Sequence, residues 1–194
     1  PPGTPEVTLE MNPGTLERER LPGFHASGVN RVSVGVQSFT DATLKRLGRA
    51  HGADEARKTL DAARGVGFAV LSIDLIFGVP GQRLADVESD IADALAFDPD
   101  HVSAYELTIE AGTPFALADR RGQLDRAEEA DVVAMMSAVE VGLSEAGLTV
   151  HACPVIAAEC ARLGFALPEA VTEETARPGM VIVADGPNAE HGLP

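Results

Sequence analysis

The residues best suited to binding chemistry stand at or just beyond the ends of apolar segments. In chain order they are Glu10, Gln37, Arg49, Asp74, Thr108 and Glu110. Carboxylates can accept hydrogen bonds from ribose hydroxyls or from an α-amino group, and a guanidinium can fork onto a carboxylate. An amide adds both donors and an acceptor. If the fold brings these positions together, they suit a zwitterionic ligand that is rich in hydroxyl groups.

Alternating valines identify the element that should carry Gln37. Val32, Val34 and Val36 alternate with small residues, which favours a strand with little room on one of its faces. Three more strands are expected at residues 7–10, 68–73 and 101–109, each with a polar side chain at or near its end. In parallel α/β folds, ligands bind at the carboxyl ends of the strands. The polar side chains should therefore share one rim.

Helices are expected between these strands, at residues 15–26, 41–47, 53–64, 84–95 and 126–145. Pro22 should break or kink the first of them. In the last, a stripe with Met135 and Met136 predicts core packing rather than a cofactor site. The alternation of strands and helices predicts an α/β fold with a parallel sheet. Because the dinucleotide and P-loop glycine motifs do not occur, we expect part of a barrel, with about four parallel strands and outer helices.

Several candidates also have a purely structural explanation. An exposed position in a strand explains Glu10 as well as ligand contact does. Asp74 is flanked by apolar residues and should be enclosed, so it needs a partner, either a structural N–H group or Arg49. His51 fits a loop residue better than a catalytic base. The sequence therefore leaves the roles of Glu10 and Asp74 open.

Composition narrows the class of protein. The formal charge of −15, from 30 acidic and 15 basic residues, repels phosphate backbones, so we expect no nucleic-acid partner. We expect no transmembrane segment and no secretory signal, since no apolar run is long enough and no basic-then-apolar segment opens the chain. Cys153 and Cys160 fit neither a zinc nor an iron–sulfur spacing, and two free thiols agree with a cytoplasmic location.

Five ordered blocks of sequence carry a resemblance to a known family. They read VTLEMNPGT (7–15), GVNRVSVGVQSF (28–39), LGRAHG (47–52), IDLIFGVPGQ (73–82) and LTIEAGTP (107–114). Together they resemble the radical S-adenosylmethionine (SAM) proteins called oxygen-independent coproporphyrinogen III oxidase-like, or HemW-type haem chaperones. The resemblance covers residues 6–147. The residues at 47–49 and 107–109 look closer to the HemW-type chaperones, which we call the chaperone branch.

The resemblance implies a partial (β/α)6 barrel, of which residues 1–148 would supply strands three to six. It also implies that Glu10, Gln37, Arg49 and Asp74 contact SAM, with Thr108 contributing largely through its backbone. In the whole family a [4Fe–4S] cluster cleaves SAM to a radical. Members of the chaperone branch bind haem or porphyrin and transfer haem to respiratory enzymes.

The departures from the family pattern define the expected function. No Cys-x3-Cys-x2-Cys occurs in the 194 residues, so the usual cluster ligands are absent. The glycine-rich motif of the second family strand is also missing, and residues 149–194 are expected to form a divergent or poorly ordered tail. We therefore expect part of a HemW-type radical SAM protein that is inactive alone. The alternatives are a non-catalytic module that binds haem or SAM, and a βα barrel piece without a ligand.

Overall fold

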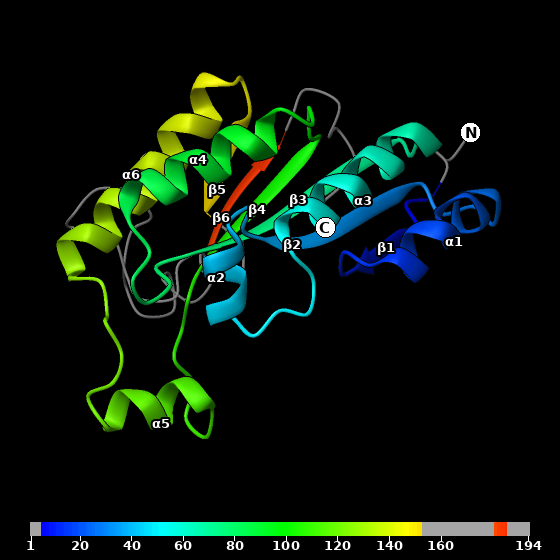
Figure 1. Ribbon diagram of the computed structural model, residues 1–194. Coiled ribbons are helices and arrows are strands. Elements are labelled where there is room, and N and C mark those ends of the chain that lie inside the picture. The colour runs from blue at the N-terminus through cyan, green and yellow to red at the C-terminus, as the bar shows by residue number, and fades with distance from the viewer. Residues whose placement is uncertain (1–4, 153–180, 186–194) are drawn as a thin grey trace.

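The computed structural model describes residues 5–152 and 181–185, which form one six-stranded sheet covered by helices (Figure 1). The strands run in the order β1-β2-β3-β4-β6-β5. Their bounds are Thr8–Met11 (β1), Arg31–Gln37 (β2), Val70–Phe77 (β3), His101–Glu106 (β4), Thr149–Ala152 (β5) and Val181–Asp185 (β6). Strands β1 to β4 are parallel in consecutive order, as the sequence predicts, and β6 adds to β4 in the antiparallel sense.

The helices connect the strands and cover one face of the sheet. Their bounds are Thr15–Ala26 (α1), Asp41–Arg46 (α2), Ala53–Val66 (α3), Leu84–Leu95 (α4), Pro114–Arg120 (α5) and Glu129–Glu145 (α6). In Figure 1, α3, α4 and α6 lie above the sheet, whereas the short α5 projects away from it. None of the helices in this part of the chain is long and apolar enough to cross a membrane.

The core forms between the helices and the apolar face of the sheet. Val32, Val34 and Val36 are fully buried, because alternate residues of a strand point to the same face. Met135 and Met136 of α6 are buried in the same cluster, so the expectation that they pack in the core is confirmed. The apolar faces of the helices thus pack against the apolar face of the sheet, on which every second residue of a strand lies.

The opposite face of the sheet is polar. It carries Glu10, Ser33, Ser72, Asp74 and Ser103, a set that we call the polar face. Glu10 pairs with Ser33, and Ser33 with Ser72, so three of these residues stand in one row across the sheet. Consecutive parallel strands with helices packed on one face are typical of a barrel segment, whereas doubly wound sheets carry helices on both faces. The predicted fold class is confirmed.

Three features of these elements differ from what the sequence predicts. Helix α1 continues through Pro22, because Leu21 beside it is fully buried in the core and the proline itself is exposed. Strand β3 continues to Phe77, so Asp74 lies inside it rather than after its end. Strand β4 ends at Glu106, which leaves Thr108 in the following loop. The predicted positions of Asp74 and Thr108 at strand ends were therefore only approximately right.

The segment 149–194 contributes two strands to the described structure. β5 and β6 pair with each other in the antiparallel sense, and β6 covers the edge of β4. Strands at a sheet edge expose unpaired backbone groups, so this pairing protects β4. The remaining residues of the segment, including Cys153 and Cys160, lie outside the described ranges.

Candidate polar ligand site at the end of the sheet

The end of β2 presents Gln37 in an unusual backbone conformation. The register between β2 and β3 shifts between Val34 and Gln37, which marks a bulge. Gln37 has φ of 70°, in the left-handed region that non-glycine residues rarely adopt. Bulges often re-aim a side chain beside a functional site. The sequence placed Gln37 at the strand end, but it contained no signal for this backbone geometry.

The amide of Gln37 lies over Gly35 and close to β1. A Cβ atom at Gly35 would lie 2.9 Å from Nε2 of Gln37 and 3.2 Å from Oδ1 of Asn12. Little room therefore exists on this side of β2, as the small residues between the valines predict. Asn12, which the sequence analysis did not select, directly follows β1 and brings a second amide to this end of the sheet.

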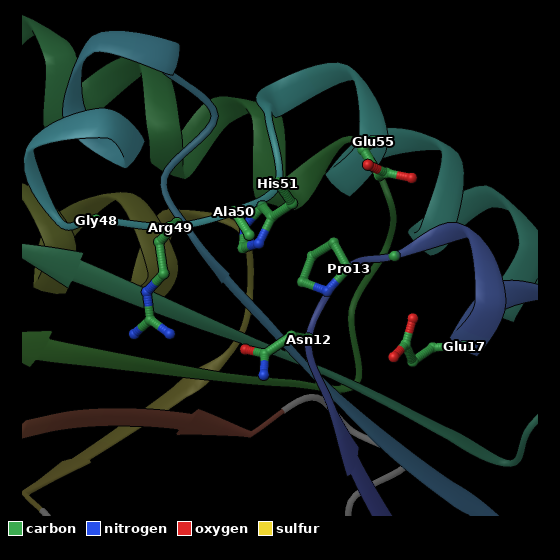
Figure 2. A pocket seen from close by; sticks show the side chains of 9 residues that line it. Asn12, Pro13, Glu17, Gly48, Arg49, Ala50, His51 and Glu55 are labelled. Carbon is green, nitrogen blue, oxygen red and sulfur yellow. The ribbon is translucent and has the colours of Figure 1, made fainter.

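A pocket of about 420 Å³ opens beside Asn12 (Figure 2). It is lined by Asn12, Pro13, Gly14, Glu17, Gly48, Arg49, Ala50, His51 and Glu55. Its volume falls within the range of roughly 300–1,000 Å³ that small-molecule sites occupy. It is built from the loop after β1, the loop between α2 and α3, and the first turns of α1 and α3.

Charges of opposite sign lie on opposite sides of this pocket. Figure 2 shows Arg49 beside Asn12 on one side, with Glu17 and Glu55 on the other. Arg49 is half-buried, and its side chain makes no hydrogen bond or ion pair with another residue in the described ranges. Glu55 is already engaged, because its Oε1 accepts a hydrogen bond of 2.8 Å from Oγ1 of Thr15. The guanidinium is therefore available to an anionic group.

Asp74 is held by Ser33 on the polar face. The Ser33 hydroxyl lies 3.2 Å from each carboxylate oxygen of Asp74. Burial raises the pKa of the Asp74 carboxyl and the negative charge of Glu10 raises it too, whereas the hydrogen bond from Ser33 and the nearby His101 lower it. The predicted alternatives for the partner of Asp74, an N–H group or Arg49, were both wrong. A serine within the valine strand is the signal that would have found it.

The structure brings most of the predicted residues near one another, but not all. Glu10 and Asp74 share the polar face and interact electrostatically. Gln37 lies beside Asn12, which lines the pocket that contains Arg49. Thr108 is exposed in the loop after β4 and has no recorded contact with the other candidates.

Two further polar groups near the site also bear on its chemistry. The hydroxyl of Ser72, a residue 1% exposed, has no hydrogen-bond partner within the described structure. Buried hydroxyls are normally paired, so the group is able to serve a ligand or a solvent molecule on the polar face. His51 is a loop residue, as predicted. It is also buried, and its Nε2 donates to the carbonyl oxygen of Val36 at 3.1 Å. That bond holds the imidazole against the end of β2.

Comparisons with known proteins agree with the fold. Residues 2–94 match the model of the radical SAM superfamily. The chain is 46% identical over 110 residues to the haem chaperone HemW of Escherichia coli strain K12, which covers 57% of this chain and 29% of that protein. It is 37% identical over 146 residues to the mitochondrial radical S-adenosyl methionine domain-containing protein 1 of Bos taurus, covering 75% of this chain and 33% of that protein.

A solved structure extends the comparison to the fold. Coproporphyrinogen III oxidase (HemN) from Escherichia coli, a radical SAM enzyme, aligns with a TM-score of 0.63 and 25% sequence identity, over 74% of this chain and 33% of that one. The chain thus spans about a third of the length of the relatives it matches. It contains part of a radical SAM domain and is related to HemW and to coproporphyrinogen III oxidase.

Proposed function

We propose that this chain supplies part of a SAM-binding site. In this proposal Glu10, Gln37, Arg49 and Asp74 contact SAM through their side chains, and Thr108 contributes through its backbone. The radical SAM family implies SAM as a cofactor. The five positions are those to which the resemblance in the sequence assigns SAM contacts. The observation that carries the proposal is the guanidinium of Arg49, which lies in a polar pocket and has no partner among the described residues.

Arg49 would bind the carboxylate of the methionine part of SAM. A guanidinium presents donors in a fork that matches a carboxylate, and such charge-assisted pairs are stronger than neutral hydrogen bonds. Asn12 lies on the same side of the pocket and offers an amide to the same end of the ligand. Glu17 on the other side of the pocket favours an adjacent positive charge, which suits a zwitterion.

Asp74 and Glu10 would accept hydrogen bonds from the ribose hydroxyls or from the α-amino group. Asp74 carries a raised pKa because it is largely buried and lies close to Glu10. Donors from a ligand would stabilise the charged form of such a carboxylate and lower its pKa. The hydroxyl of Ser72, which stands in the same row as Glu10 and has no partner among the described residues, is a further group that a ligand could satisfy.

The residues present do not fit the [4Fe–4S] cluster that the family also implies. The chain has only two cysteines, Cys153 and Cys160, and no Cys-x3-Cys-x2-Cys. Within the described residues no group of three or more His, Cys, Asp or Glu side chains is placed to hold a metal ion. We therefore propose that this chain alone binds SAM without cleaving it. Anaerobic reconstitution with iron and sulfide that produced a [4Fe–4S] EPR signal would contradict this statement.

Haem binding is the second candidate function, because HemW relatives are named as haem chaperones. In that case the chain would act in haem trafficking in the cytoplasm, with a respiratory haem protein as the recipient. Titration with haem tests it directly: a saturable shift of the Soret band supports binding, and an unchanged band removes this candidate.

Isothermal titration calorimetry with SAM tests the main proposal. We expect saturable heat with the wild-type chain and a strongly reduced affinity for Arg49→Ala. Arg121→Ala is the matched control, because Arg121 is exposed at the end of α5, which projects away from the sheet (Figure 1). Equal affinities for the two variants, or no heat with the wild type, would refute the assignment.

A further inference from the structure

The residue type of Gln37 does not explain its left-handed backbone conformation, so the cause must lie in the surrounding structure. A glutamine has a Cβ atom, which makes positive φ unfavourable, and such residues persist where the surrounding structure holds them. Gln37 is 9% exposed and its φ is 70°. The groups that hold the residues on either side of it therefore set the direction of its amide.

Asp90 of α4 holds the residues that follow Gln37. Its Oδ2 accepts a hydrogen bond of 2.7 Å from the hydroxyl of Ser38, and its Oδ1 accepts one of 2.7 Å from the backbone N–H of Phe39. The oxygen of Ser38 in turn accepts from the N–H of Thr40 at 3.0 Å. Three consecutive residues after Gln37 are thus fixed by one buried carboxylate.

If only stability mattered, a buried aspartate would be an unfavourable residue at position 90. The residue is 3% exposed, and burial raises the pKa of its carboxyl to about 6 although the bonds from Ser38 and Phe39 lower it. Buried acids that serve packing alone can often be replaced by apolar residues at little cost. The specific bonds to the loop after β2 therefore indicate a role in fixing that loop.

His51 holds the residue that precedes Gln37. Its Nε2 donates to the carbonyl of Val36, and both residues are buried. His51 lines the same pocket as Arg49, two residues earlier in the loop. The imidazole therefore ties the Arg49 loop to the end of β2, and Gln37 lies between two anchored segments.

We propose that Asp90 and His51 are positioning residues that hold Gln37 in its left-handed conformation, so that its amide is directed towards the ligand of the polar site. The proposal rests on the proposed SAM binding for its functional part. Its structural part, the control of the Gln37 backbone, is independent of any ligand.

The first test reads the backbone of Gln37 by NMR in the full chain without ligand. The Cα and Cβ shifts of Gln37 report its φ and ψ region. In Asp90→Ala we expect them to move towards extended values, with partial recovery in Asp90→Asn, whose amide oxygen can still accept from Phe39. Glu88→Ala on the same helix is the control, because Glu88 is exposed. Unchanged Gln37 shifts in folded Asp90→Ala would overturn the proposal. If that variant does not fold, Ser38→Ala removes one anchoring bond and decides in the same way.

The second test is a double-variant cycle with SAM as the probe. We expect Asp90→Ala to weaken SAM binding about two- to tenfold, the loss typical of one hydrogen bond. In a Gln37→Ala background the same change should have no further effect, because Asp90 acts through Gln37. Additive losses would overturn the positioning role. If the wild type binds no SAM, the proposed function fails, while the NMR result still decides the positioning role.

Discussion

Ionisation of Asp90 should make the folded chain less stable as the pH rises. Its carboxyl is buried in α4, and its pKa is raised from 3.8 to about 6 in the folded chain. Between these two values the folded chain binds a proton that the unfolded chain releases. Stability from this group is therefore fully present below about pH 4 and is lost as the pH rises through about 6.

The size of the effect follows from the two pKa values. The gap between 3.8 and about 6, at ~1.36 kcal/mol for each pH unit, amounts to about 3 kcal/mol. Asp93 and Asp86 add to the rise in pKa, and Arg57 lies near Phe39 and pairs with Asp93. Most of the loss should fall between pH 4 and pH 7.

Urea unfolding of the wild type and of Asp90→Asn isolates this effect. The variant retains an acceptor for Phe39 but cannot ionise. The free energy of unfolding of the wild type, minus that of the variant, should fall by about 2–3 kcal/mol from pH 4 to pH 7. A difference that stays constant over this range would refute the claim that Asp90 ionises in a buried site.

Three further outcomes follow from the same structure. Gly35→Ala should displace the amide of Gln37, because the new Cβ would lie 2.9 Å from its Nε2, and should weaken SAM binding in calorimetry. Ser33→Ala should raise the pKa of Asp74 further, because it removes a hydrogen bond to the charged form, and an NMR titration of the Asp74 carboxyl carbon measures this. Gly67→Ala should cost about 1–2 kcal/mol in urea unfolding, because the helix α3 ends there at φ of 85°.

The parallel sheet could be predicted because its signal is local. The valines of β2 alternate with small residues, and the helices carry apolar stripes. The spacing of the apolar residues therefore indicates the type of each element. Of the break or kink predicted at Pro22, the break was wrong, because burial of Leu21 depends on tertiary packing, which a local rule does not contain. The addition of β6 was missed although Val181, Ile182 and Val183 form a short β-branched run.

The candidate site was harder to predict, because it depends on contacts between distant segments. An aspartate in a helix, such as Asp90, is typical of a solvated surface, and only the fold shows its bonds to the loop after β2. The left-handed backbone of Gln37 likewise arises from groups 14 and 53 residues away, His51 and Asp90. Polar residues near strand ends were visible in the sequence, but their partners were not.

The most direct test of the account is a ¹H–¹⁵N NMR titration of the full chain with SAM. We expect saturable shifts at the side-chain amide of Gln37 and the guanidinium N–H of Arg49, with smaller changes around Asp74 and none at Arg121. Shifts that are absent, or that fall on other surfaces while Gln37 and Arg49 stay unchanged, would contradict the assignment of a SAM site to this end of the sheet.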